Sequence, residues 1–340
     1  MPAHPLTRDT IPDALRQAKA EAVAQFLRPG ARAPAYAAYA AVAAPEANVV
    51  GIGIGRKVSR GRATTRQCVT FYVIRKVHKD ALSADDLLPA RLGKAATDVV
   101  ETGEFFAFAS PPPRVRSRLR PARPGCSIGF KFTGHDTNMV MAGTFGAVAS
   151  LGGRTVILSN NHVLADENRL PIGSPIFQPG LLDGGNEATD VVAHLTKFIA
   201  LSAAQPNAVD CAIAEVTSPK LVSAAVLLPI GKLKSGSPLP AKERLEVEKV
   251  GRTTAYTRGR ITDLSADVKI RYETGMLTFA DQLLIEAESG PFSAAGDSGS
   301  LIVAKQAKRP VALLFAGSDT HTIANPIGEV LSALGIGIVV

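Results

Sequence analysis

Ser298, His162 and Asp210 are residues of the types used in acyl-transfer chemistry, and each lies in a short motif. Ser298 lies within Gly-Asp-Ser-Gly-Ser (296–300), directly before an apolar run. A serine flanked by glycines at the start of a strand has the backbone freedom to aim main-chain amides at a substrate carbonyl. Ser298 is therefore a candidate nucleophile. The alternative interpretation is an ordinary tight turn, in which Asp297 and Ser298 hydrogen-bond to their own backbone.

The histidine and the aspartate each adjoin an apolar segment. His162 lies just past the apolar strand candidate 155–158, and Asp210 comes before the apolar run 211–214. A serine hydroxyl is a poor nucleophile until a base removes its proton, and a histidine base needs a carboxylate to fix its tautomer. The order His, Asp, Ser, with separations of 48 and 88 positions, supplies these parts.

All three motifs resemble those of the trypsin-like, chymotrypsin-fold serine endopeptidases of the PA clan. Ser-Asn-Asn-His-Val (159–163) resembles the histidine motif of the bacterial HtrA-type members, and Val-Asp-Cys-Ala-Ile (209–213) resembles the strand that carries the family's aspartate. Gly-Asp-Ser-Gly-Ser resembles the serine motif. The resemblance covers residues from about 126 to 340 and leaves no length for a PDZ domain. It implies a mainly β fold: a trypsin-like double six-stranded Greek-key β-barrel, preceded by a small α/β N-terminal domain.

The resemblance also implies roles for the motif residues. Ser298 is expected to be the nucleophile, His162 the general base and then acid, and Asp210 the group that orients His162. The backbone amides of Gly296 and Ser298 are expected to form the oxyanion hole. Asp297 is not expected to belong to the triad, and we expect it to pair with an amide or an arginine.

The substrate pocket is expected at four apolar or small residues. By resemblance its base falls near Phe292 and its walls are formed by Phe315, Ala316 and Gly317. An apolar base cannot neutralise a lysine or arginine side chain, so we predict small or aliphatic P1 residues. His321 is a second candidate for the pocket, where it would admit an acidic P1 residue; otherwise it lies on a surface loop.

Length and patterning predict several units along the chain. A chain of 340 residues exceeds what one core usually supports. We predict an N-terminal helix and Ala/Pro-rich segment (1–47), a small α/β accessory domain (48–110), a Pro/Arg-rich linker (111–124), a first barrel (125–221) and a second barrel with a C-terminal helix (222–340). Within the accessory domain we expect strands at 49–55, 67–75 and 96–101 and a short helix near 83–88.

Glycines at positions 51, 53 and 55 allow two interpretations. They invite comparison with a nucleotide-binding loop, but no GK[ST] motif follows and the expected helix is missing. Glycines at every second position of a strand share one face, where a neighbouring segment can approach closely. We favour close packing and predict neither a cofactor nor a metal ion.

The net charge of +8 raises the question of a polyanionic partner. Five arginines concentrate in the linker, at positions 114, 116, 118, 120 and 123. We interpret them as part of a solvated, extended linker. The chain has no tryptophan and few other aromatic residues for stacking on single-stranded bases, so we do not expect a nucleic-acid partner.

Cysteine usage and the N-terminal sequence indicate a cytoplasmic protein. Cys68, Cys126 and Cys211 are odd in number and scattered, which argues against a disulfide framework, and we interpret them as small buried residues. The first residues contain no apolar signal segment, and no apolar window is long enough to span a membrane.

The leading hypothesis is a serine endopeptidase that acts on a protein or peptide substrate. The alternative is a catalytically weak peptide-binding or scaffold protein with the same fold. The N-terminal module followed by a trypsin-like domain also resembles narrow-leaf-type proteins of bacteria and plants, which implies homo-oligomers.

Overall fold

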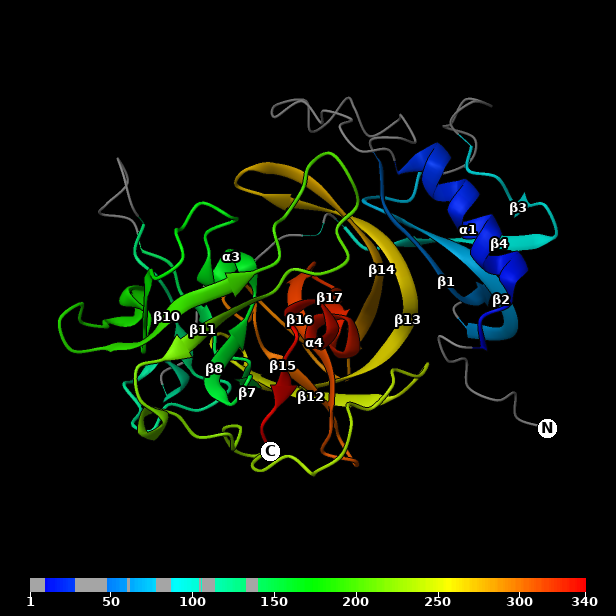
Figure 1. Ribbon diagram of the computed structural model, residues 1–340. Helices are drawn as coiled ribbons and strands as arrows, with labels where there is room; N and C mark the ends of the chain where they lie inside the picture. Colours follow the sequence, from blue (N-terminus) through cyan, green and yellow to red (C-terminus); the bar gives the residue numbers. More distant parts are fainter. Residues whose placement is uncertain are drawn as a thin grey trace.

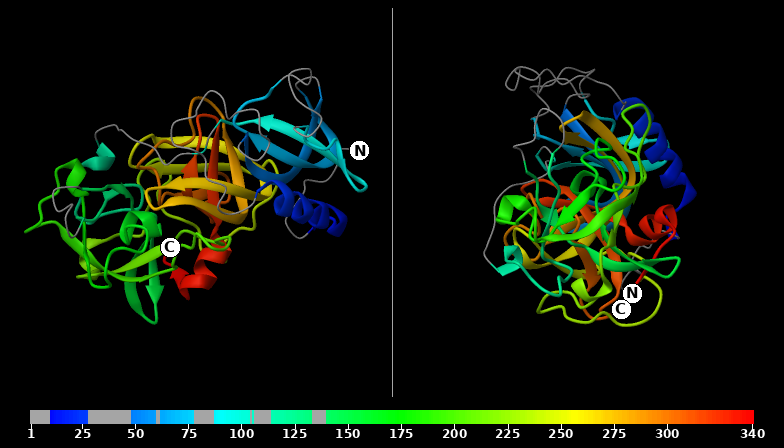
Figure 2. Two further views of the ribbon diagram at one scale, coloured as in Figure 1. Left: turned by 90° about the horizontal axis from the view of Figure 1, so that it is seen from above. Right: turned by 60° about the vertical axis from the view of Figure 1, so that its left-hand side comes forward.

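Strands dominate the computed structural model, which describes residues 10–27, 48–59, 62–77, 87–103, 105, 114–132 and 140–340. Three α-helices have described bounds: α1 (Asp13–Phe26), α3 (Asn161–Leu164) and α4 (Ile327–Leu334). In Figures 1 and 2 the two strand-rich bodies lie next to each other, and the N-terminal elements lie on the far side of the second body. The expected mainly β fold is confirmed.

The first barrel is formed by short strands between residues 127 and 216, joined by one C-terminal strand. The strands are β5 (Ser127–Ile128), β6 (Gly143–Thr144), β7 (Ala147–Leu151), β8 (Arg154–Ser159), β9 (Pro175–Phe177), β10 (Val191–Phe198), β11 (Ala212–Val216) and β18 (Gly337–Ile338). The main sheet has the order β18-β7-β8-β11-β10-β9. A bridge from Gly129 to Phe177 joins β9 to the end of β5, and β5 pairs with β6, which leads into β7. These links close the ring.

The second barrel closes through its own strand pairing. Its strands are β12 (Glu246–Gly251), β13 (Ala255–Tyr272), β14 (Gly275–Ala287), β15 (Leu301–Ala304), β16 (Pro310–Gly317) and β17 (His321–Pro326). They follow the order β12-β15-β16-β17-β14-β13, and β12 also pairs with β13. Two barrels are therefore present, as expected: the second has six strands of its own, and the first has a six-stranded main sheet to which β5 and β6 are added.

The N-terminal strands extend the sheet of the second barrel. They are β1 (Val49–Ser59), β2 (Arg62–Val73), β3 (Arg91–Leu92) and β4 (Ala95–Glu101). β1, β2 and β4 overlap the three predicted strands, and β3 is additional. β1 pairs with β13 at Gly51 and Val268, so one sheet of ten strands runs from β12 to β3. Of the helix predicted at 83–88, residues 83–86 lie outside the described residues, and 87 and 88 are not helical. The boundaries of the units stay a prediction.

The glycines of β1 permit close contact with β13. A Cβ on Gly53 would lie 2.1 Å from Oδ2 of Asp263, and a Cβ on Gly51 would lie 2.9 Å from Val268. The buried Asp263 carboxylate accepts a hydrogen bond of 2.6 Å from the Tyr72 hydroxyl of β2. The alternating glycines thus serve close packing between the N-terminal strands and the second barrel.

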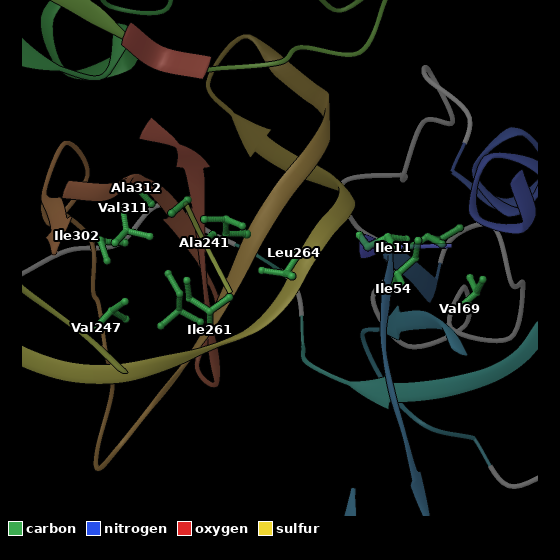
Figure 3. Packing of buried hydrophobic residues seen from close by; sticks show 14 of the residues in the cluster. Ile11, Ile54, Val69, Ala241, Val247, Ile261, Leu264, Ile302, Val311 and Ala312 are labelled. Atoms are coloured by element: carbon green, nitrogen blue, oxygen red, sulfur yellow. The ribbon is translucent and has the colours of Figure 1, made fainter. Parts of the chain in front are cut away.

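One hydrophobic cluster joins the N-terminal region to the second barrel. Figure 3 shows it passing from Val247 and Ile302 in the barrel, past Leu264 on β13, to Ile54 and Ile11. Beside it, the buried ammonium of Lys19 on α1 contacts three polar residues of the β13–β14 hairpin: Asp267 at 2.7 Å, Asp281 at 3.1 Å and Ser265 at 3.0 Å. Shared core and buried charges together anchor α1 to the barrel.

The arginine-rich segment packs against the first barrel, in contrast to the solvated linker that we expected. Arg118 and Arg120 both contact Asp190, at 2.6 and 3.2 Å, and Arg116 lies 3.7 Å from Asp183. The carboxylates at positions 183 and 190 lie far along the sequence, so the pattern of the segment alone did not reveal them. Three of the four linker arginines whose side chains the structure describes therefore have acidic partners.

The three cysteines are free thiols without solvent exposure, as predicted. Burial raises the pKa of Cys68 to about 11 and that of Cys126 to about 12, and it also raises the pKa of Cys211. These thiols stay protonated near neutral pH. In the described part of the chain, no helix is both long and apolar enough to cross a membrane.

Candidate functional site

His162 and Asp210 are brought together inside the first barrel. His162 lies on α3, directly after β8, and Asp210 lies just before β11, which pairs with β8. Their side chains meet with 2.5 Å between Nδ1 and Oδ2. The Asp210 side chain is fully buried and the His162 side chain is 8% exposed. A carboxylate in this position holds the imidazole with its Nε2 directed away from the aspartate.

The Asp210 carboxylate has partners on both oxygens. Oδ1 accepts hydrogen bonds from the backbone amides of Asn161, at 2.6 Å, and His162, at 3.4 Å. Oδ2 contacts the His162 ring and accepts a hydrogen bond of 2.6 Å from the Tyr272 hydroxyl. A buried carboxylate is stable only when such donors replace its water. The arrangement keeps Asp210 in a defined orientation toward His162.

Tyr272 is a site residue that the sequence did not reveal. It ends β13, and the turn to β14 follows, with Gly275 at a φ of 130°. Its ring meets the His162 ring edge to face at 5.7 Å and stacks on Phe279 at 5.8 Å. Phe279 in turn contacts Phe315 at 4.7 Å. This aromatic series connects the histidine to the segment that lies beside Ser298.

Ser298 lies where the serine loop of the second barrel meets the first barrel. Its carbonyl accepts a hydrogen bond of 2.8 Å from the Thr144 amide, and the Thr144 hydroxyl donates to the Gly296 carbonyl, also at 2.8 Å. Gly143 faces both Ser298 and Val163, the neighbour of His162: a Cβ there would lie 3.1 Å from the Ser298 carbonyl oxygen and 2.7 Å from the Val163 methyls. The serine and histidine segments therefore converge on β6.

The hydroxyl of Ser298 donates to the Phe315 carbonyl at 3.2 Å. The His162 Nε2 is buried and has no hydrogen-bond partner among the described residues. The structure therefore forms the His162–Asp210 bond but no hydrogen bond from Ser298 to His162.

Two main-chain amides of the serine loop have no acceptor among the residues that the structure describes. Gly296, at a φ of 87°, and Gly299, at a φ of 91°, fold the loop around Ser298. Among the described residues, the Gly296 and Ser298 amides donate no hydrogen bond, whereas the Gly299 amide donates to Leu314. Unpaired donors beside a serine are what an oxyanion site requires.

Asp297 organises the serine loop through a buried network. Its carboxylate accepts hydrogen bonds from the backbone amides of Thr253, Thr254 and Ala294, at 2.7 to 3.3 Å. The Lys249 ammonium lies 3.2 Å away, and neither side chain has exposed surface. Burial lowers the pKa of Lys249, and the attraction of Asp297 opposes that effect. We expected an amide or an arginine as the partner; the amides are present, but the cation is a lysine.

The loop after α3 clamps the β13–β14 turn. The Glu167 carboxylate accepts hydrogen bonds from the backbone amides of Glu273, at 3.0 Å, and Thr274, at 2.8 Å. Asp166, Glu167 and Asn168 have positive φ angles of 49°, 51° and 76°. Such conformations cost non-glycine residues free energy and persist where surrounding contacts enforce them. The clamp holds Tyr272 close to the His162–Asp210 pair.

The predicted pocket residues lie near the serine loop but pack into cores. Phe292 is 3% exposed and belongs to the hydrophobic cluster that joins the N-terminal region to the second barrel. Its ring packs closely on Gly259, where a Cβ would lie 2.8 Å from it. Phe315 and Ala316 belong to a second cluster that also contains Phe279, and Gly317 ends β16. Their assignment to a substrate pocket stays a prediction.

His321 lies on β17 and not on a surface loop. Its Nε2 lies 3.4 Å from Oε1 of Glu286, and its Nδ1 lies 2.9 Å from the Thr320 hydroxyl. The hydrogen bond from His321 is the main cause that lowers the pKa of Glu286. His321 lines a cavity of about 350 Å³ together with Tyr72 and other residues of the N-terminal strands. Because Glu286 already occupies Nε2, an acidic substrate side chain would have to displace it.

No group of three or more metal-ligating side chains is found among the residues that the structure describes. The donors at the site are the imidazole, hydroxyl and amide groups already given. They suit proton transfer and oxyanion binding.

Comparison with known proteins gives partial matches. The model of the Nal1 C-terminal domain matches residues 230–325. Protein NARROW LEAF 1 of Oryza sativa subsp. japonica is 25% identical over 303 residues, which cover 79% of this chain and 51% of the relative. The chain thus spans about half the length of this relative.

Three solved structures of proteases are similar to this chain. A glutamic-acid-specific serine protease that uses a histidine triad in substrate binding is 19% identical, with a TM-score of 0.45, over 64% of this chain and 100% of its own. Protease A of Thermobifida fusca is 17% identical, with a TM-score of 0.45, over 64% of this chain and 97% of its own. Cellulomonas bogoriensis chymotrypsin is 16% identical, with a TM-score of 0.42, over 64% and 97%.

Proposed function

We propose that this chain is a serine endopeptidase in which Ser298 is the nucleophile, His162 the general base and Asp210 the group that orients His162. One observation supports this most strongly. The His162 imidazole is bonded through Nδ1 to a fully buried carboxylate, while its Nε2 is buried and has no hydrogen-bond partner in the part of the chain that the structure describes. That is the arrangement of a base poised to accept a proton.

The reaction would proceed in two halves. His162 takes the proton of the Ser298 hydroxyl as its oxygen attacks the peptide carbonyl carbon, and the carbonyl oxygen becomes an anion. The free amides of Gly296 and Ser298 are the donors for that anion. The intermediate then collapses, the C–N bond breaks, and the leaving amine takes the proton from His162. Water repeats the sequence on the acyl-enzyme and releases the acid.

One side-chain movement is needed before attack. The Ser298 hydroxyl now donates to Phe315, 3.2 Å away. Rotation of the Ser298 side chain would release that bond, and we propose that it frees the hydroxyl to hydrogen-bond to Nε2 of His162. A bound substrate that contacts Phe315 would favour the rotation, and hydrogen bonds at catalytic sites commonly tighten only in the substrate complex.

The same hydrogen bond favours a second candidate function. A protein in which Ser298 keeps its bond to Phe315 would bind peptides beside the serine loop without cleaving them. Such a catalytically weak binding or scaffold protein would retain the fold and the buried networks. Reactivity of Ser298 distinguishes the two functions.

The proposed substrate is a protein or peptide with a small or aliphatic P1 residue, bound near Phe292, Phe315, Ala316 and Gly317. All four residues are apolar or small, so none of them offers a charge to a basic or acidic P1 side chain. We do not propose a nucleic-acid or membrane partner. Cytoplasmic location and homo-oligomers stay predictions, and light scattering of the purified chain tests the latter.

Hydrolysis of a peptide library by wild-type protein tests the proposal. We expect cleavage after small or aliphatic residues, no cleavage by Ser298→Ala, and wild-type cleavage by the control Ser235→Ala, whose side chain is exposed. Equal cleavage by a clean Ser298→Ala preparation would refute the assignment. A profile led by basic P1 residues would refute the pocket alone.

A further inference from the structure

Tyr272 places a neutral hydroxyl on the oxygen that also holds His162. The Tyr272 hydroxyl lies 2.6 Å, and the His162 Nδ1 2.5 Å, from Oδ2 of Asp210. Burial, and next the negative charge of Asp210, raise the pKa of Tyr272 well above its ordinary value. The phenol therefore stays protonated and acts as a donor. The reaction as proposed above makes no use of this hydroxyl.

We infer that Tyr272 is a positioning residue, which fixes the Asp210 carboxylate and thereby the angle of the His162 imidazole; this inference rests on the proposed peptidase function. With two backbone amides on Oδ1 and the phenol on Oδ2, the carboxylate cannot rotate without losing a hydrogen bond. The hydrogen bond from the phenol also stabilises the negative charge on Oδ2, the oxygen that the imidazole contacts. Both effects act on His162 through Asp210, without contact with a substrate.

The position of Tyr272 depends on both barrels. The tyrosine extends from the second barrel on β13, while its partner Asp210 belongs to the first. The turn that follows Tyr272 is held by Glu167, in the loop after the α3 helix that carries His162. In Figure 1 the hairpin tip reaches the region of α3. The hydrogen bond from Tyr272 to Asp210 therefore depends on how the two barrels pack against each other.

A packing role for the ring must be separated from the role of the hydroxyl. The ring contacts His162 and Phe279, so Tyr272→Ala would disturb both. Tyr272→Phe keeps these contacts and removes only the oxygen. Tyr256→Phe is the matched control: Tyr256 lies on the same strand and its hydroxyl donates to a different carboxylate, that of Glu248, at 2.8 Å.

The deciding measurement is the proton NMR resonance of His162 Nδ1–H, which is assigned by its loss in His162→Ala. We expect it to shift or to broaden in Tyr272→Phe and to stay unchanged in Tyr256→Phe. An unchanged resonance in Tyr272→Phe would overturn the inference, and so would the same change in both variants, because the effect would then come from the strand. This comparison does not need turnover.

Kinetics supply the second readout. We expect Tyr272→Phe to lower kcat about tenfold while KM changes by less than about twofold, because a hydrogen bond to a charged group is lost without any loss of substrate contact. Unchanged kcat in an active protein would count against the inference. Wild-type protein that fails to react at Ser298 with a fluorophosphonate would refute the peptidase proposal instead, and the NMR comparison would still decide the role of Tyr272.

Discussion

The Lys249 ammonium on β12 lies 3.2 Å from the carboxylate of Asp297, the residue before Ser298, and both side chains are fully buried. Inside the barrel, where neither charge is hydrated, each charged group is stabilised by the other. Asp297 also holds amides on both sides of it, from the turn after β12 and from the segment before the serine. The ion pair therefore fixes the main chain that presents the Gly296 and Ser298 amides.

Lys249→Met is expected to destabilise the protein strongly. The substitution leaves a buried carboxylate without its cation, which costs about 3–5 kcal/mol of unfolding free energy. Urea unfolding measures the loss. Lys220→Met, at an exposed lysine, is the control and should stay within about 0.5 kcal/mol of wild type. Equal stability of Lys249→Met and wild type would show that the pair does not support the loop.

Gly53→Ala is expected to weaken docking of the N-terminal strands. The new methyl group would lie 2.1 Å from the Asp263 carboxylate, so the strand or the acid must move and the hydrogen bond from Tyr72 is strained. We expect the unfolding free energy to fall by about 1–3 kcal/mol, as at other overpacked sites.

The matched glycine for comparison is Gly328 on α4. A Cβ there meets no atom within 4 Å, and its φ is not positive, so Gly328→Ala should raise the unfolding free energy by up to about 1 kcal/mol. Thermal unfolding of both variants checks the pair of predictions. A neutral Gly53→Ala would mean that the N-terminal strands do not pack on β13 as described.

The local patterns of the sequence predicted the strands but not all of their partners. Alternating glycines at 51, 53 and 55 indicated a close approach, and the acid that approaches, Asp263, lies about 200 positions away. Gly152 and Gly153 form the two-residue turn between β7 and β8, where both residues have positive φ. Local turn chemistry is visible in sequence, whereas the choice of a distant partner is decided by packing.

The candidate site shows the same division. Its motifs identified His162, Asp210 and Ser298, whereas Tyr272 and Lys249 stand in no motif. Tyr272 ends the 18-residue strand β13, in which polar residues and β-bulges interrupt the alternation of apolar and polar positions. Only the pairing of this strand with β14 brings the phenol to Asp210.

Asp190→Asn is expected to destabilise the first barrel in a pH-dependent manner. Burial alone would raise the pKa of Asp190, but the hydrogen bond from Arg118, the Asn186 amide and the charge of Arg120 outweigh it and lower the pKa. A carboxyl with a lowered folded pKa contributes stability above its unfolded pKa of about 3.9, and that contribution is lost as pH falls through the folded value.

The measurement compares urea unfolding of wild type and Asp190→Asn at pH 7 and near pH 3. We expect Asp190→Asn to be less stable at pH 7 and the difference to shrink near pH 3, because below the unfolded pKa the unfolded wild-type chain binds a proton at Asp190 more readily than the folded protein does. Asp319→Asn, at an exposed position, should track wild type at both values. A difference that stays constant across this range would contradict the assigned ion pairs.

The most direct test of the central claim is the site of reaction with a fluorophosphonate probe, located by mass spectrometry of the intact and digested protein. The account predicts one covalent adduct on Ser298, absent in Ser298→Ala and strongly slowed in His162→Ala, whose folded state is checked by its unfolding transition. Folded wild-type protein that carries no adduct on Ser298, or that reacts equally fast when His162 is replaced, would contradict it.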